Sequence, residues 1–111
     1  MRAIATFTAM GFDVSVPLTE SAAYDIVVDD GAGLHRVQCK YCGGARMQVD
    51  LRQIHTNGGG YVVKRVPQDA YDWLYVLCED RAEYLIKECL YGRRSLDLRP
   101  TYRLGAVAES G

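Results

Sequence analysis

The sequence predicts an α+β fold, with a mixed, mainly antiparallel central sheet and one flanking N-terminal helix. Three observations lead to this prediction. Apolar residues follow a helical spacing only in the first ten positions, several later segments alternate in polarity or are rich in β-branched and aromatic residues, and glycine-rich turns separate them. The 111 residues, 49% of them hydrophobic, suffice for a single domain over residues 1–111 with one core.

The N-terminal half is predicted to contain a helix followed by a strand and a hairpin. Ala3, Ile4, Phe7 and Met10 share a helical face, and Gly11 is a suitable stop. Residues 12–17 alternate and read as a strand that ends at the proline. Residues 24–29 and 34–42 then form two strands joined by the turn "DGAG".

The C-terminal half is predicted to supply the rest of the sheet. Residues 46–54 alternate weakly, 55–60 ("HTNGGG") read as a flexible loop, and 61–66 as a short strand. Pro67 favours a short helical turn over 67–73. Residues 74–78 and 82–90 form two further strands around the turn 79–81, and 106–111 are predicted to fray.

Composition and charge narrow the class of protein. No apolar run approaches the roughly 20 residues of a membrane span, and no secretory signal is evident. We therefore predict a cytoplasmic protein whose thiols are reduced. Narrower alternatives are a nucleoid-associated protein and a phage-encoded one. Residues 1–35 hold one basic and five acidic residues, and the remainder twelve basic and nine acidic. A basic C-terminal part beside an acidic centre suits a protein that binds phosphates and a cation, but it also fits an ordinary solvated tail.

The hairpin brings three chemically informative residues together. If Asp29 pairs with Leu34, Asp25 falls opposite Gln38, and Lys40 is its diagonal neighbour on the same face. Asp25 and Gln38, with the backbone carbonyl of Cys39, offer the oxygen ligands that Mg²⁺ prefers. Lys40 would orient a water molecule or stabilise charge on a phosphate. A solvated hairpin face with an ordinary lysine–aspartate pair remains the alternative.

The four cysteines raise the alternative of a small zinc protein. Cys39 and Cys42 have a ligand-like spacing, but Cys78 and Cys89 form no second close pair, and His35 and His55 would have to complete the site. We therefore expect Cys39 and Cys78 to behave as small apolar residues of the sheet.

The segment "PLTESAAYDIVVDDGAGLHRVQCKY" resembles the core of the PD-(D/E)XK nuclease superfamily. It is most similar to the small group that includes group I intron homing endonucleases and their phage and archaeal relatives. In that group an aspartate follows a strand-entry proline and Q-x-K replaces E-x-K. Asp25 matches the aspartate, and Gln38 and Lys40 match Q-x-K. The resemblance extends over about residues 3–90, because the preceding strand and "YDWLYVLC…AEYLIKE" also fit.

The resemblance implies a restriction-endonuclease-like core and a metal-dependent DNA endonuclease, of the homing-endonuclease or Holliday-junction-resolvase kind. Asp25, Gln38 and the Cys39 carbonyl would bind Mg²⁺ or Mn²⁺, with Lys40 as the third catalytic residue. The partner would be double-stranded or branched DNA, and a homo-oligomer is expected because cutting a duplex needs two sites. The candidates for phosphate contacts are Arg36, Arg46, Lys64, Arg65, Arg93, Arg94, Arg99 and Arg103.

One departure from the family pattern concerns a glutamate early in its first helix. No acid lies between Met1 and Gly11, and counting back from Gly11 reaches Met1 or beyond. Either the sequence is truncated at its N-terminus or the site lacks this carboxylate, with Glu20 as an auxiliary acid. The alternative function is therefore a catalytically impaired DNA-binding or assembly module of the same fold.

Overall fold

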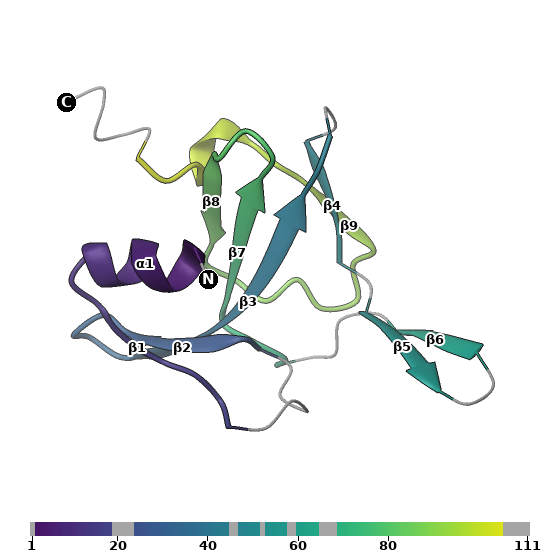
Figure 1. Cartoon of the computed structure of the whole chain (residues 1–111), viewed down its shortest axis with the longest axis horizontal. Coiled ribbons are helices and arrows are strands. Elements are labelled where there is room, and N and C mark those ends of the chain that lie inside the picture. Colours follow the sequence, from purple (N-terminus) through teal and green to yellow (C-terminus); the bar gives the residue numbers. More distant parts are fainter. Residues whose placement is uncertain are drawn as a thin grey trace.

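A five-stranded sheet in the order β1-β2-β3-β7-β8 forms the centre of the protein in a computed structural model (Figure 1). The structure describes residues 2–18, 24–44, 47–51, 53–57, 60–64 and 69–105, with the backbone alone in 53–57 and 60–64. β3 is parallel to β7, and the other three pairings are antiparallel. The strands are β1 (Asp13–Ser15), β2 (Ile26–Asp29), β3 (Leu34–Cys42), β7 (Trp73–Cys78) and β8 (Glu83–Ile86).

Helix α1 (Arg2–Ala9) covers one face of this sheet (Figure 1). Ala3 and Phe7, one helical turn apart, are fully buried, and the Phe7 ring lies 5.8 Å from that of Tyr75 and 6.3 Å from that of Trp73. The helix stops at Gly11, whose φ of +89° is accessible to glycine at little cost. The predicted N-terminal helix and its stop are therefore confirmed.

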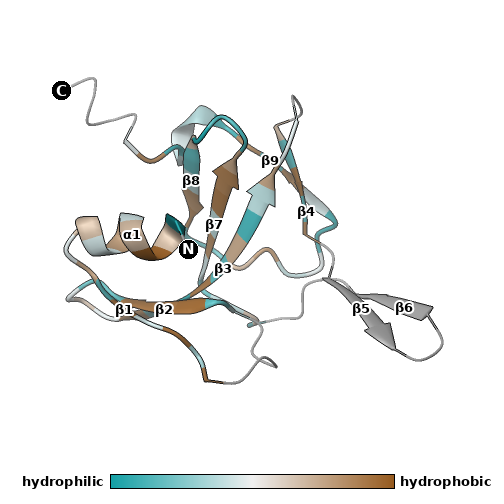
Figure 2. Ribbon diagram, viewed as in Figure 1, coloured by the Kyte–Doolittle hydropathy of each residue, from teal (hydrophilic) through white to brown (hydrophobic). Residues whose placement is uncertain are grey.

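The opposite face of the sheet is covered by β4 (Gln48–Asp50) and β9 (Ser95–Asp97), which pair antiparallel with each other. Val49 and Leu96 from this pair join Leu74 and Val76 of β7 in a second buried cluster. Figure 2 shows β7 as an apolar strand between these layers. Because both of its faces are packed, β7 lacks the polar alternation of a strand that faces water on one side.

A two-stranded hairpin, β5 (Gln53–Asn57) and β6 (Gly60–Lys64), projects from the body (Figure 1). The prediction of a flexible loop over 55–60 is wrong where the structure describes it, since residues 55–57 and 60 lie in these paired strands. The sequence "NGGG" lies between two β-prone segments and is typical of a hairpin turn. Its glycines therefore favour a tight turn between paired strands over a long flexible loop.

Two further predictions need correction. The helical turn over 67–73 is absent from the part that the structure describes: residues 69–72 form a turn and bend, Asp69 has a φ of +62°, and Trp73 already begins β7. The strand predicted over 82–90 ends at Ile86. The sequence analysis did not predict β9, because this short strand forms only by pairing with β4, which is far away in the sequence. The prediction for 106–111 lies outside the described residues.

Within the described part of the chain, no helix is long and apolar enough to cross a membrane.

Candidate active site

The β2–β3 hairpin has the register that the sequence predicted. Asp29 pairs with Leu34 and Ile26 with Val37, and the ladder ends there. The N–H of Asp25, directly before β2, donates to the carbonyl of the same Val37 at 2.9 Å, so two successive residues face Val37 and the chain departs from the regular register at Asp25, as in a β-bulge. Such a departure redirects a side chain, and here it brings the Asp25 carboxylate to the β2 edge of β3.

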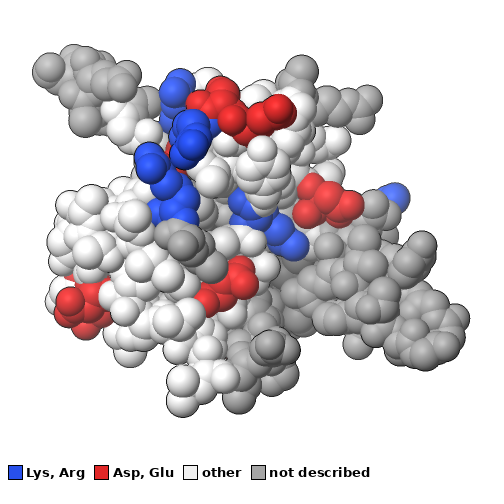
Figure 3. Space-filling view, viewed as in Figure 1, with Lys and Arg blue, Asp and Glu red and all other residues white. Residues whose placement is uncertain are grey.

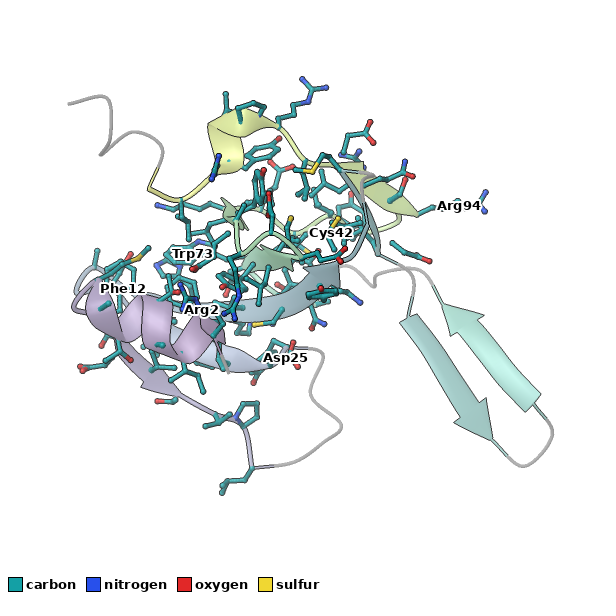
Figure 4. The ribbon with its side chains drawn as sticks, turned by 45° about the horizontal axis from the view of Figure 1, so that its top comes forward. Arg2, Phe12, Asp25, Cys42, Trp73 and Arg94 are labelled. Atoms are coloured by element: carbon teal, nitrogen blue, oxygen red, sulfur yellow. The ribbon has the colours of Figure 1, made fainter. Side chains whose placement is uncertain are left out.

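The Asp25 carboxylate takes the place of the next strand partner of β3. Its Oδ2 accepts a hydrogen bond from the Cys39 backbone N–H at 2.8 Å. Among the described residues this is the carboxylate's one hydrogen bond, so its second oxygen has no donor there. In Figure 4, the Asp25 side chain lies where the chain enters β2. The bond fixes the orientation of the carboxylate without occupying it fully.

Gln38 and Lys40 flank on β3 the residue whose N–H binds the Asp25 carboxylate, Cys39. Both side chains are partly exposed, as is Asp25. Neither makes a hydrogen bond or ion pair with another residue in the described ranges. An acid, an amide and an amine thus come from the Asp25–Cys39 bond and the two residues that flank Cys39 on β3, and among the described residues one carboxylate oxygen, the amide group and the amine have no hydrogen-bond partner.

The donors gathered here fit a hard divalent cation. Because the N–H and C=O of one strand residue point to the same edge, the Cys39 carbonyl faces the Asp25 side of β3. A free carboxylate oxygen, the Gln38 amide oxygen and this carbonyl would make three oxygen donors, which suit Mg²⁺ or Mn²⁺. Among the described residues, no three histidine, cysteine or acidic side chains group as a metal site, so any cation here would rely on the neutral oxygens beside Asp25.

The cysteines have the properties of buried thiols. None of the four cysteines, all within the described residues, forms a disulfide, and Cys42 and Cys78 are buried. Burial together with the nearby Asp25 charge raises the pKa of Cys39 to about 12. Burial, followed by the neighbouring Cys42, raises the pKa of Cys78 to about 11. Protonated thiols are poor zinc ligands and poor nucleophiles at neutral pH. Within the described ranges the cysteines also form no metal cluster with His35.

Arg36, a predicted phosphate ligand, is already bound to two carboxylates. Its side chain bonds Asp69 at 2.7 Å and Asp72 at 3.2 Å, and the Asp72 carboxylate also accepts the Arg36 backbone N–H at 2.8 Å. Hydrogen bonding to Asp72, and then to Asp69, raises the pKa of Arg36. The hydrogen bond from the Arg36 side chain in turn lowers the pKa of Asp72. Sequence reasoning missed both aspartates, since their partner lies more than thirty positions away.

Helix α1 contributes no acid to the site, but a carboxylate from β8 lies against it. Glu83 accepts hydrogen bonds from Arg2 Nε at 3.0 Å, from the Tyr75 hydroxyl at 2.9 Å and from the Thr6 hydroxyl. Burial raises the pKa of Glu83, but the bonds from Thr6, Arg2 and Tyr75 outweigh it and lower the pKa overall. Three donors occupy this carboxylate, so Glu83 attaches the helix to the sheet. Glu20, the predicted auxiliary acid, lies outside the described residues.

The other predicted phosphate ligands are dispersed. Arg93, Arg94, Arg99 and Arg103 are exposed, and Figure 4 shows Arg94 pointing away from the fold. Arg46 and Arg65 lie outside the described residues, and Lys64 is described as backbone at the end of β6. On the face shown in Figure 3, basic and acidic groups alternate, so the described part of this face has no single broad basic surface.

The fold and this hairpin define a nuclease of the PD-(D/E)XK class. Residues 1–99 match the family described as PD-(D/E)XK endonuclease, and the chain belongs to that family. Among solved structures, it is similar to the bacterial homing endonuclease I-Ssp6803I, with a TM-score of 0.74 and 24% sequence identity over 91% of this chain and 80% of that one. No curated protein matches the sequence. The similarity confirms the predicted α+β architecture with its mainly antiparallel central sheet.

Proposed function

We propose that this chain is a metal-dependent DNA endonuclease that hydrolyses phosphodiester bonds in double-stranded or branched DNA. The observation that carries the proposal is the Asp25 carboxylate, fixed at 2.8 Å on the backbone N–H of Cys39, the residue between Gln38 and Lys40 on β3. A carboxylate fixed by one oxygen and open at the other suits a cation ligand. Membership of an endonuclease family supplies the reaction class.

In this proposal Asp25, Gln38 and the Cys39 carbonyl bind Mg²⁺ or Mn²⁺. The cation would supply Lewis-acid stabilisation of the phosphate and a more acidic water. Lys40, one strand position beyond Cys39, would donate to the attacking water or to the phosphate oxygens as negative charge develops on them. The exposed arginines Arg93, Arg94, Arg99 and Arg103, with Arg46, Lys64 and Arg65, are the proposed phosphate contacts along the DNA.

A homodimer or larger homo-oligomer follows from the same chemistry. One such site cuts one strand, so cutting both strands of a duplex requires two sites related by symmetry. We further propose that residues 1–111 act as one domain and that the protein works in the cytoplasm on cellular or phage DNA.

A cleavage assay with supercoiled plasmid and a four-way junction tests this function. Wild type should nick or cut at least one of the two with Mg²⁺ or Mn²⁺, and Lys40→Ala should reduce the rate by about 10²- to 10³-fold while melting normally. Lys87→Ala changes an exposed lysine directly after β8, whose ammonium lies 5.0 Å from the centre of the Trp73 ring. It is the matched control and should cut at the wild-type rate. Absence of wild-type cleavage with either metal would refute the enzymatic proposal.

The second candidate is a DNA-binding or assembly module that does not cleave. Helix α1 favours it, because its first turn carries no acid and the nearest carboxylate found, Glu83, is occupied by three donors. This candidate predicts DNA binding without cleavage in the same assay.

A further inference from the structure

Arg36 makes an unusual number of internal bonds for an arginine beside a DNA-cleaving site. Its guanidinium donates to the Asp69 carbonyl at 2.9 Å and to the Asp69 carboxylate at 2.7 Å. It also donates from Nε and from one terminal nitrogen to the Asp72 carboxylate, both at 3.2 Å. These four bonds use four of the five N–H donors that an arginine has. One donor is left for any other ligand.

The partners of Arg36 lie on both sides of the proposed site. Asp69 and Asp72 form the entry to β7, the strand that pairs with Gln38 and Lys40 in parallel register. On the other side the Arg36 guanidinium carbon lies 5.9 Å from the centre of the Tyr24 ring, within cation–π range, and Tyr24 directly precedes Asp25. Arg36 thus contacts both the segment that carries the metal-binding carboxylate and the segment beside Gln38.

We propose that Arg36 is a positioning residue for the active site: it fixes the Tyr24–Asp25 segment and the entry to β7 against β3, and so sets the place of the Asp25 carboxylate relative to Gln38. The inference rests on the proposed function, since it concerns the same site. This role takes the place of a direct contact between Arg36 and a DNA phosphate. Full use of the guanidinium by a phosphate would require four of its N–H donors to leave their present partners. The planar guanidinium suits this role, because a lysine cannot bond two carboxylates and a carbonyl at once.

The two roles of Arg36 predict opposite effects for a change in Asp72. If Arg36 positions the site, Asp72→Asn weakens the bond and should impair the site as a change in Arg36 does. If Arg36 binds phosphate, Asp72→Asn frees the guanidinium and should tighten DNA binding. Arg36→Lys separates the roles as well, because lysine keeps the charge for phosphate but loses the paired bonds.

The experiment compares wild type, Arg36→Lys, Asp72→Asn and the control Arg81→Lys, an exposed arginine in the β7–β8 turn. Three quantities are measured: Mn²⁺ affinity by calorimetry, affinity for a junction oligonucleotide by fluorescence anisotropy across a salt series without metal, and the cleavage rate. Both test variants should lose about 10- to 100-fold in Mn²⁺ affinity and in cleavage rate, the usual effect of disturbing a residue behind a metal ligand. Their DNA affinity and salt slope should match those of wild type.

The inference is overturned if Arg36→Lys behaves as wild type, if Asp72→Asn tightens DNA binding, or if wild type binds no Mn²⁺. A salt slope reduced by about 0.9 in Arg36→Ala would identify a phosphate contact instead. If wild type binds Mn²⁺ but cuts no DNA, the proposed function fails while the Mn²⁺ titrations still decide the role of Arg36. Should Arg36 variants not fold, Asp69→Asn weakens one bond, because it removes the charge of a carboxylate that is 83% exposed, and it should give a smaller loss of Mn²⁺ affinity. An unchanged affinity in that variant overturns the inference.

Discussion

Asp25 and Asp72 use the same local device for different ends. Each directly precedes a strand, β2 or β7, and each donates its backbone N–H to a β3 carbonyl, at 2.9 Å and 2.8 Å respectively. Each carboxylate also accepts a β3 backbone N–H at 2.8 Å, from Cys39 in one case and from Arg36 in the other. The difference is what occupies the remaining oxygen.

Arg36 saturates the Asp72 carboxylate, and no side chain among the described residues does so for Asp25. An aspartate that is fully bonded inside the protein contributes to the fold, because its charge is neutralised and its oxygens are used. An aspartate that is fixed but only partly bonded is available to a cation. The comparison teaches that the position of an aspartate before a strand does not decide its role. What decides it is whether the second carboxylate oxygen already has a hydrogen-bond partner inside the protein.

The largest expected effect separates the two aspartates by catalysis. Asp25→Asn should reduce metal-dependent cleavage by about a thousandfold, because it removes the charged ligand and with it several kcal/mol of stabilisation. Asp29→Asn, at the far end of the strand that Asp25 precedes, is the matched control, since asparagine keeps the acceptor for the Gly31 N–H. Cleavage by Asp25→Asn at the Asp29→Asn rate would remove Asp25 from the proposed ligand set.

The next effect concerns stability, where the change at Asp72 should have a larger effect than the change at Asp25. Asp72→Asn should lower the free energy of unfolding by about 1–2 kcal/mol, towards the low end for charged hydrogen bonds because Asp72 is 39% exposed. Asp25→Asn should cost less, since it loses one bond and no ion pair. Urea unfolding of both variants measures the difference, and a larger loss for Asp25→Asn would contradict the comparison.

A change at Gln38 sharpens the same contrast. Gln38→Glu places a second carboxylate beside Cys39, whose N–H binds Asp25, and should raise Mn²⁺ affinity about tenfold, because affinity for hard cations grows with ligand charge. Without metal the two negative charges should lower stability by about 0.5–1 kcal/mol. Calorimetry and urea unfolding with and without Mn²⁺ give both values. Unchanged affinity in both Gln38→Glu and Gln38→Ala would remove Gln38 from the ligand set.

The smallest effect is the acid dependence of Asp72. Hydrogen bonds from Arg36 lower its pKa below that of the unfolded chain, near 4, so the folded state holds the ionised form more strongly. This contribution is fully present above the unfolded pKa and is lost as pH falls through the lower folded value. The stability advantage of wild type over Asp72→Asn should therefore shrink, by less than about 1 kcal/mol, as pH falls below about 4. An advantage that grows on acidification would rule this out.

Local patterns in the sequence sufficed for the hairpin and the first helix. Alternation in residues 24–29 and 34–42 and the turn between them predicted the pairing of Asp29 with Leu34, and the structure confirms this register as far as Ile26 and Val37. The bonds of Arg36 could not be predicted from the sequence, because Asp72 comes close to Arg36 only when β3 and β7 pair in parallel. The pairing of β4 with β9 joins residues almost fifty positions apart and leaves no local signal.

The helical turn predicted after Pro67 failed for a related reason. Acidic residues near a proline are typical of a helix start, but Asp69 and Asp72 are held by Arg36 from another strand. Tertiary bonds overrode the local preference, and Asp69 adopts a positive φ as part of that arrangement.

The amide of Cys39 that holds Asp25 belongs to the same strand as Gln38 and Lys40. The proposed ligands and the proposed catalytic lysine therefore reside in one contiguous stretch of chain, residues 24–42. Among the described residues, the only support that this stretch takes from the β7 side through Arg36 comes from two aspartates, Asp69 and Asp72. A transplant of the proposed site to another sheet would therefore need this stretch together with those two acids.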